Sequence, residues 1–384
     1  MTYDGNSTGE SKGTGNSAVS DRSLLIVGPT RGTTGGIASY IAEQCRRLPS
    51  DIHLRTHDTG AMGGSRSGSA VAVAVRSVAN TFRFPFRTPP DLLHVHTSEA
   101  VSFYRNAFYV LFAALVWRCP VVLHVHGPTF DRFVTEASPF GRFVQQRVFA
   151  ASDAIVVLSE HWRTVLEPIV KSEKLRIIPN AVDPDLYAPT TTATVDRTDE
   201  NCPHVVFLAD HIRRKGVTDF VAAIDSLSRD DVEDFRVTIA GKGPLSACAV
   251  AVAERHPHVE YRGYVSEDEK RRLLCAASIF VLPTRAEGLP IGILEAMAAG
   301  TAVVSTSVGA ITSVVDEETG IIVDPAKPTA LTDALACLIA APERTEELGE
   351  RGRERIEVMY TWQIAIERLV QLYDDILRQP TPPP

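Results

Sequence analysis

Short apolar runs recur along the whole chain, and helix-length segments separate most of them. Each run has four to six residues and is rich in β-branched side chains, as is typical of strands buried on both faces. This alternation predicts a parallel sheet covered by helices. The predicted strands are residues 24–27, 92–96, 121–126, 154–159, 175–180, 204–209, 236–241, 259–263, 278–283, 301–306 and 320–324.

The pattern breaks once, in a segment between 182 and 203 that is rich in proline, threonine and charged residues. A chain of 384 residues also exceeds what one core usually holds. We therefore expect an α/β fold class with two Rossmann-like, doubly wound domains. The expected parts are a disordered leader over 1–20, an N-terminal domain over 21–185, a linker over 186–203, a C-terminal domain over 204–361, a helix over 362–377 that packs back on the first domain, and a disordered tail over 378–384.

The composition is that of a globular protein from a reducing compartment. Hydrophobic residues make up 44% of the chain, and six cysteines are scattered without a C-x-x-C pair or a His-Cys cluster. That pattern argues against a disulfide scaffold and against a zinc site. The first twenty residues lack the apolar run and basic start of a signal peptide. The longest apolar run, 107–117, is too short to span a bilayer. We therefore expect a cytoplasmic protein.

Charge is unevenly divided along the chain. The net charge is −8, but residues 21–185 hold 18 Lys and Arg against 14 Asp and Glu, whereas residues 200–360 hold 17 against 26. Solubility alone can explain the acidic surplus. Alternatively, the basic first half meets an anionic partner such as a membrane surface or a phosphorylated acceptor, because arginines and aromatic residues interleave over 75–87 and 138–149. No nucleic-acid partner is expected.

The stretch RAEGLPIGILEAMAAG, residues 285–300, places two acids around a loop that opens a helix. Pro290 suits the first helical turn, which puts Glu287 in the loop and Glu295 in the second turn. The first backbone N–H groups of a helix lack partners and favour an anion such as a diphosphate. The flanking carboxylates can accept hydrogen bonds from a polyol. By spacing alone, two exposed glutamates beside a helix start explain the pattern equally well.

The same stretch, extended to residue 325, resembles the donor-site signature of family 4 retaining glycosyltransferases, whose E-x7-E motif falls on Glu287 and Glu295. Further segments resemble family landmarks in the same order, namely GPTRGTTGGIASYI (28–41), LLHVHTS (92–98), VVLHVHG (121–127), IIPNAVDPDLYAP (177–189), VVFLADHIRRKGVTDFV (205–221) and VTIAGKGPL (237–245). The resemblance implies the GT-B fold, in which two Rossmann-like domains face each other across a cleft. It also implies sugar transfer from a nucleotide diphosphate sugar to an acceptor hydroxyl, without a metal or other cofactor.

The resemblance assigns roles to individual residues of the second domain. Glu287 lies against the transferred sugar near its reacting carbon, and Glu295 binds the ribose hydroxyls. Lys215 neutralises the diphosphate and so favours its departure. Sugar hydroxyls and phosphate oxygens are held by the loop between the acids, which consists of Gly288, Leu289, Pro290, Ile291 and Gly292.

In the first domain, the resemblance assigns roles to a glycine loop and a histidine. Gly35 and Gly36 match a loop that approaches the donor phosphates, where a Cβ would clash. His126 matches a histidine at the end of a strand, facing the cleft and the sugar. His124 shares the face of His126 by strand periodicity, so one of the two is expected to be structural.

The chain departs from the family pattern at two places. Asp210 stands where the family usually has an arginine. Arg213 or Arg214 is therefore expected to supply the second cation, unless the RRK sequence is a solvated charge run. Ala310 and Ser313 replace a usual glycine and glutamate, which bears on the shape of that loop.

Together these features predict a retaining glycosyltransferase that acts on a lipid-linked or other glycan acceptor in surface polysaccharide synthesis. No metal is expected, because the D-x-D sequence at 183–185 suits a turn in the interdomain segment better than a cation site. Two alternatives stay open. One is a nucleotide-sugar epimerase of the same fold, which needs no acceptor. The other is a non-catalytic relative that binds sugars or nucleotides.

Overall fold

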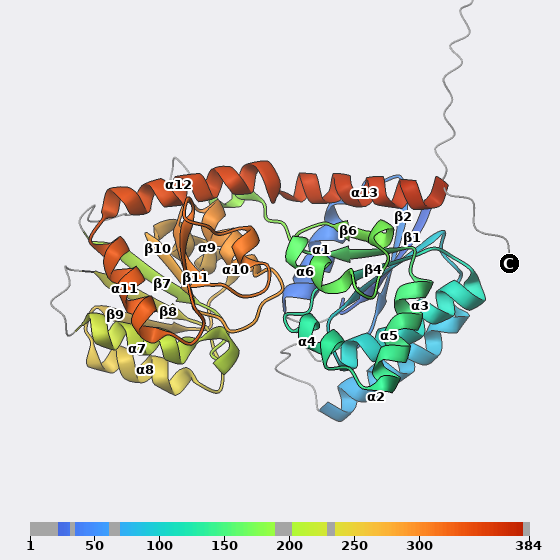
Figure 1. Cartoon of the computed structure of the whole chain (residues 1–384), viewed down its shortest axis with the longest axis horizontal. Helices are drawn as coiled ribbons and strands as arrows, with labels where there is room; N and C mark the ends of the chain where they lie inside the picture. Colours follow the sequence, from blue (N-terminus) through green and yellow to red (C-terminus); the bar gives the residue numbers. More distant parts are fainter. Residues whose placement is uncertain (1–21, 31–34, 61–69, 189–201, 229–234, 379–384) are drawn as a thin grey trace, which may run out of the picture.

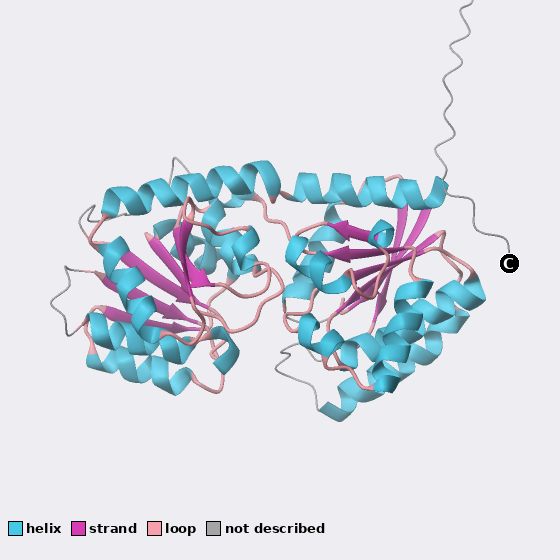
Figure 2. Cartoon of the chain, in the orientation of Figure 1, coloured by secondary structure: helices cyan, strands magenta, loops and turns pink. Residues whose placement is uncertain are grey.

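The computed structural model describes residues 22–30, 35–60, 70–188, 202–228 and 235–378. The predicted leader, most of the predicted linker and nearly all of the predicted tail lie outside these residues. The described chain forms two bodies, each with a central sheet between layers of helices (Figure 1). Two C-terminal helices run along both bodies, and Figure 2 shows the same layering by secondary structure.

The first sheet has six parallel strands in the order β2-β1-β3-β4-β5-β6. Every residue of β3, β4 and β5 is buried, as their apolar runs predict. The strand order reverses between β1 and β3, and such a reversal opens a ligand crevice at the carboxyl ends of the strands. The strands are β1 (Arg22–Gly28), β2 (Ile52–Asp58), β3 (Leu92–Thr97), β4 (Val121–Val125), β5 (Ala154–Val157) and β6 (Leu175–Ile177).

The second sheet also has six parallel strands, in the order β12-β11-β10-β7-β8-β9. Here the strand order reverses between β7 and β10. The predicted fold class of two Rossmann-like, doubly wound domains is therefore confirmed. The strands are β7 (His204–Leu208), β8 (Arg236–Ala240), β9 (Val259–Gly263), β10 (Ile279–Leu282), β11 (Ala302–Thr306) and β12 (Gly320–Val323).

Helices connect successive parallel strands and cover both faces of each sheet (Figure 2). Three of them start with a proline at the first position, where its missing N–H is not needed. The helices are α1 (Gly36–Arg47), α2 (Ala70–Arg83), α3 (Val101–Phe112), α4 (Phe130–Thr135), α5 (Pro139–Ala151), α6 (Glu160–Leu166), α7 (Val217–Leu227), α8 (Ser246–Arg255), α9 (Glu267–Ala276), α10 (Ile291–Ala298), α11 (Pro328–Ile339), α12 (Pro342–Met359) and α13 (Trp362–Arg378).

Strand β2 is not marked by any apolar run. Its sequence is IHLRTHD, and only Ile52 and His57 are buried. The strand lies at the edge of the sheet and pairs with β1 alone among the described strands. An edge strand meets solvent along one side and needs few apolar residues, which explains why hydrophobic patterning does not predict it.

Helices α12 and α13, together called the strap, span both domains (Figure 1). Helix α12 packs against α10 and β11 of the second domain, and α13 places Leu369 and Tyr373 in the core of the first. Where the strap breaks, it is tied to the interdomain segment. The N–H of Val182 donates to the carbonyl of Tyr360 at 2.9 Å, and the N–H of Trp362 donates to the carbonyl of Val182 at 3.1 Å. The two chain crossings between the domains are thus hydrogen-bonded to each other.

Four histidines form a column between the first sheet and helices α1 and α13. His94 and His96 belong to β3, and His124 and His126 lie in or just after β4, with neighbouring ring centroids 4.1–5.4 Å apart. Nδ1 of His94 lies 2.6 Å from the hydroxyl of Tyr373. Burial lowers the pKa of His94 and His126 to about 3 and the pKa of His96 and His124 well below the ordinary value. All four are therefore neutral at neutral pH.

Because the four histidines take up protons only once the chain unfolds, the free energy of unfolding should fall as the pH drops below 6.5 and keep falling toward about 3. Each contributes about 1.4 kcal/mol per pH unit in that window. Urea unfolding measured at several pH values should show a flatter dependence for His124→Leu. The exposed His53→Gln should behave as wild type, and an unchanged slope in His124→Leu would contradict the argument.

Candidate active site

In the second domain, the loops after β7 and β10 meet at the point where the strand order reverses. The N–H of Arg285 donates to the carbonyl of Arg214 at 2.7 Å, and Oγ1 of Thr284 lies 2.9 Å from the same carbonyl oxygen. Gly216 has φ 75° and lies so close to Pro283 that a Cβ would stand 1.9 Å from its carbonyl oxygen. Only glycine fits at that position. The two loops therefore form one unit.

Glu287 lies at the centre of this unit and is 6% exposed. Its Oε1 accepts hydrogen bonds from Nζ of Lys215 at 2.6 Å, Nη1 of Arg214 at 3.0 Å and Oγ1 of Thr284 at 3.0 Å. Without such donors, a buried carboxylate would be strongly unfavourable. The structure thus brings Glu287 together with Lys215 and Arg214. It adds Thr284, whose place just beyond a strand at the reversal point is the one sequence signal that indicates it.

The two cations outnumber the carboxylate that they share. The side chain of Lys215 is 17% exposed and that of Arg214 is 34% exposed, so both remain within reach of a ligand. The excess positive charge attracts an anion. Arg213 is exposed and pairs with no carboxylate among the described residues, and Asp210 is exposed as well. Of the two candidates for the second cation, Arg214 is the one that reaches Glu287.

The loop between the two acids is tied to the first domain through its carbonyl groups. Nε1 of Trp162 donates to the carbonyl of Gly288 at 3.0 Å, and Nδ2 of Asn180 donates to the carbonyl of Leu289 at 2.7 Å. Gly288 lies so close to the first domain that a Cβ would stand 2.7 Å from the carbonyl oxygen of His126. Because these carbonyls are engaged, the remaining hydrogen-bonding capacity of the loop lies in its N–H groups.

Helix α10 begins one residue later than predicted. Pro290 has extended backbone angles (φ −71°, ψ 119°) and occupies the N-cap position, so it does not form part of the first turn. No side chain of the described residues caps the helix, and the N–H groups of Ile291 and Gly292 are suited to bind an anion. Across from this helix start, a methyl group built on Gly36 would lie 4.0 Å from Cδ1 of Ile291, and one built on Gly35 would meet nothing within 4 Å.

Glu295 is engaged separately from Glu287. Its Oε1 accepts a hydrogen bond from Nζ of Lys270 at 2.6 Å, and Tyr187 of the interdomain segment also bonds to its carboxylate. Burial raises the pKa of Glu295, and the charge of Lys270 opposes that rise. Burial and the neighbouring Glu295 raise the pKa of Tyr187 as well. Neither Lys270 nor Tyr187 is marked by a sequence pattern, because each reaches Glu295 only through the tertiary fold.

His126 is the outermost member of the histidine column. It is only partly buried, whereas His94, His96 and His124 are buried. Its Nε2 lies 2.9 Å from Nδ1 of His96, which fixes the ring. Both ring nitrogens of His124 lack a partner among the described residues. Of the pair, His124 is thus the buried member, and the backbone of His126 lies beside Gly288.

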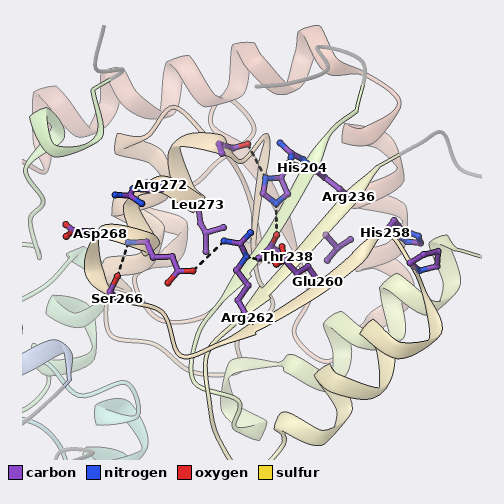
Figure 3. A pocket seen from close by; sticks show the side chains of 14 residues that line it. His204, Arg236, Thr238, His258, Glu260, Arg262, Ser266, Asp268, Arg272 and Leu273 are labelled. Atoms are coloured by element: carbon purple, nitrogen blue, oxygen red, sulfur yellow. Dashed lines mark hydrogen bonds and ion pairs between the residues drawn. The ribbon is translucent and has the colours of Figure 1, made fainter. Parts of the chain in front are cut away.

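Two other features of the described residues stand apart from this unit. A cavity of about 750 Å³ lies at the amino ends of β7 and β8 beside α9, and its Arg262 is paired with Glu260 and Glu269 (Figure 3). One group of potential metal ligands, the nitrogens of His94, His96 and His124, lies within 4.8 Å in the core of the first domain. Neither feature includes Glu287.

Family models match both domains of the chain. The model described as Glycosyltransferase Family 4 matches residues 34–186, which carry the glycine loop and His126. The model described as Glycosyl transferases group 1 matches residues 202–341, which carry Lys215, Glu287 and Glu295. Both domains are therefore similar to glycosyltransferases, each in the segment that holds its half of the candidate site.

Curated relatives match over nearly their full length. A GDP-mannose-dependent alpha-(1-6)-phosphatidylinositol monomannoside mannosyltransferase of Mycolicibacterium smegmatis is 30% identical over 383 residues, covering 91% of this chain and 97% of the relative. The alpha-maltose-1-phosphate synthase of the same species is 26% identical over 374 residues, covering 88% of this chain and 95% of the relative. The likeness therefore extends over most of the chain.

Solved structures share the fold. Sucrose-phosphate synthase from Thermosynechococcus elongatus has a TM-score of 0.74 at 18% identity, covering 92% of this chain and 99% of that one. Anabaena HepE in complex with UDP and glucose has a TM-score of 0.70 at 14% identity, covering 92% and 100%. The fold is therefore the GT-B fold. Since a relative is 30% identical over 97% of its length and family models match both domains, the chain belongs to glycosyltransferase family 4.

Proposed function

We propose that the chain binds a nucleotide diphosphate sugar at the Glu287 site and transfers the sugar, with retention of configuration, to an acceptor hydroxyl held by the first domain. The observation that carries this proposal is the pairing of Lys215 and Arg214 with one oxygen of Glu287. That pairing supplies a carboxylate for a sugar and surplus positive charge for a diphosphate in the same place.

The diphosphate binds between the two cations and the start of α10. Lys215 and Arg214 pair with its oxygens, and the N–H groups of Ile291 and Gly292 donate to it. From the first domain, the glycine loop at Gly35–Gly36 approaches without side chains. Charges fixed at this point stabilise the negative charge that develops as the bond between sugar and phosphate breaks. Arg214 takes the place of the arginine that the family usually has at position 210.

Glu287 orients the transferred sugar and stabilises the positive charge that develops on its reacting carbon. All three of its donors bind Oε1, and Oε2 receives no hydrogen bond from the described residues. Oε2 is therefore available to a sugar hydroxyl. As the carbon–oxygen bond to phosphate breaks, the acceptor oxygen forms its bond on the same face. The departing phosphate oxygen takes the acceptor's proton.

Glu295 and His126 hold the two ends of the donor. The carboxylate of Glu295, fixed by Lys270 and Tyr187, accepts hydrogen bonds from the ribose hydroxyls. His126 is neutral at neutral pH because burial lowers its pKa to about 3. The imidazole thus meets the sugar as an uncharged hydrogen-bonding group, which avoids placing a cation beside the developing positive charge.

The first domain presents apolar side chains to solvent on one face. No helix among the described residues is long and apolar enough to cross a membrane. Helices α2, α3 and α5 lie together on one side of the first sheet (Figure 1). These helices and the segments beside them carry large hydrophobic side chains that are exposed, and Phe86 is exposed at 90%. The exposed residues are Val75, Val78, Phe82, Phe86, Val101, Tyr104, Phe108, Leu115, Val116, Phe140 and Phe143.

The same segments are basic. Residues 75–87, 101–118 and 139–151 contain arginines and no Asp or Glu. Apolar side chains set among cations suit the interface of an anionic bilayer, because the former enter the headgroup region and the latter pair with the lipid phosphates. The chain therefore acts at an anionic membrane surface on a lipid-linked acceptor. The name of the mannosyltransferase relative, which specifies a phosphatidylinositol monomannoside, supports this acceptor class.

Glu287→Gln should lower sugar transfer about a hundredfold or more. Affinity for UDP or GDP should hold or rise, because Lys215 and Arg214 lose a competing anion. Transfer of radiolabelled sugar from a panel of UDP-, GDP- and ADP-sugars measures the first effect, and calorimetry measures the second. Glu347→Gln, exposed on α12, is the matched control. Wild-type transfer by Glu287→Gln would refute the role of this carboxylate.

Lys215→Ala and Arg214→Ala should each weaken the binding of the nucleoside diphosphate about tenfold or more, because a charge-assisted contact with phosphate is lost. Arg213→Ala should bind it as wild type, since that side chain points into solvent and does not reach Glu287. Calorimetric titration with UDP and GDP tests all three proteins. A loss in Arg213→Ala that matched the loss in Arg214→Ala would assign the second cation to Arg213.

The wild-type chain should sediment with vesicles that contain phosphatidylglycerol and not with vesicles of phosphatidylcholine alone, and salt should weaken the binding. The double substitution of Phe82→Ser and Phe86→Ser should lower this binding about tenfold or more, because about 2 kcal/mol of transfer free energy is lost per aromatic ring. Val358→Ser, at an exposed apolar residue of α12, should bind as wild type. Equal binding by the double variant would exclude this face.

A further inference from the structure

We infer that a cavity beside Glu99 in the first domain binds the uncharged, hydroxyl-bearing ring of the acceptor. The inference rests on the proposed function and deepens it by assigning the acceptor site. The cavity is shallow and open to solvent, with a volume of about 450 Å³, and clefts that bind small ligands measure roughly 300–1,000 Å³. Its walls include Glu99, Tyr104, Thr129, Arg132, Phe133 and Glu136.

The cavity lies at the edge of the first sheet that faces the donor. Glu99 follows β3 and Thr129 follows β4, so both lie at the carboxyl ends of neighbouring strands, of which β3 borders the reversal point. Gly127 packs directly against Glu99, since a Cβ on Gly127 would lie 1.9 Å from Oε2 of that glutamate. Because Gly127 follows His126, the cavity adjoins the histidine assigned to the transferred sugar.

The carboxylate of Glu99 accepts fewer hydrogen bonds from the described residues than it can. Oε1 accepts one bond, from Oγ1 of Thr129 at 3.1 Å. Oε2 is buried and accepts none from the described residues, among which Glu99 also has no Lys or Arg partner. An ionised carboxylate can accept about four hydrogen bonds, and its burial without donors is unfavourable. Hydroxyl groups of a bound ring would supply the missing donors after a small rotation of the side chain.

The backbone holds Glu99 in place at the expense of strain. Ala100 has φ 54° and ψ −122°, a backbone conformation that residues other than glycine rarely adopt. Such strain persists where the surrounding structure enforces it, and it is concentrated at ligand sites. Here the strained residue lies in the turn between the end of β3 and the start of α3, immediately after Glu99.

The other walls favour a neutral ring over an anionic group. Tyr104 and Phe133 lie edge to face at 5.6 Å and offer apolar surface to the C–H groups of a sugar ring. At the rim, Arg132 is already paired with Glu136 at 3.1 Å. With Glu99, the cavity holds two carboxylates against one cation. A phosphate or carboxylate would therefore be repelled, whereas hydroxyl groups would be accepted.

Saturation-transfer NMR on the full chain with methyl α-mannopyranoside, methyl α-glucopyranoside, methyl α-galactopyranoside and myo-inositol tests the site. At least one of these polyols should bind the wild type, and Glu99→Gln should raise its Kd about tenfold or more. Tyr104→Ala, which removes one wall at an exposed position, should do the same and provides a second test should Glu99→Gln fail to fold. Glu173→Gln, exposed at 74% on the same domain, should bind as wild type.

Two results would overturn the inference: equal Kd values for wild type and both variants, or no binding of any of these polyols to the wild type. Calorimetry with UDP and GDP on the same samples tests the donor site separately. Normal nucleotide binding together with unchanged polyol binding would overturn the acceptor site alone. Absent nucleotide binding would overturn the donor function. The polyol measurements would then still decide whether the cavity beside Glu99 binds a hydroxyl-bearing ring.

Discussion

A single carboxylate oxygen, Oε1 of Glu287, holds together the two loops on which the candidate site depends. Lys215 and Arg214 come from the loop after β7, and Glu287 comes from the loop after β10. Without the carboxylate, the two cations would repel each other across a buried space. In the proposed function, a diphosphate would share those cations with Glu287. Donor binding would therefore redistribute the interaction that joins the two loops.

The local charge of the site opposes the charge of its domain. Residues 200–360 hold 26 acids against 17 bases, yet the described groups around Glu287 carry more positive than negative charge. Exposed charges farther away than a Debye length, about 8–10 Å at ordinary ionic strength, are largely screened, whereas partly buried neighbours are not. The domain can thus be acidic as a whole while the charges around Glu287 are positive in sum. In the first domain, the segments with exposed apolar side chains (75–87, 101–118 and 139–151) contain arginines and no Asp or Glu.

Hydrophobic patterning predicts most of this fold because strands of a parallel sheet are buried on both faces. It fails for β2, whose polar sequence suits an edge. The family motif identifies Glu287 and Lys215 by position, but it cannot choose between Arg213 and Arg214. Arg213–Lys215 form a single 3₁₀ turn, in which successive side chains point about 120° apart, so only the tertiary structure decides which arginine reaches Glu287.

The partners of the site residues are harder to predict than the residues themselves. Trp162 and Asn180 lie more than a hundred residues from the carbonyls that they bind. Lys270 reaches Glu295 from another helix. No local pattern encodes these contacts. Those of Trp162 and Asn180 arise from how the two domains pack, and that of Lys270 arises from how α9 packs against α10.

The hydrogen bonds of Val182 to Tyr360 and Trp362 have a mechanical consequence. Two covalent crossings joined at one point favour rotation of the domains about that point, and such a rotation would also have to break or strain the bonds of Trp162 and Asn180 to the loop before α10. Displacement then grows with distance from the point of rotation. Tyr187, in the interdomain segment, and Glu295, to which it bonds, would shift little, whereas α4, which lies away from the strap (Figure 1), would shift more. In the proposed function, the same rotation would therefore displace the residues that bind the acceptor farther than those that bind the nucleotide.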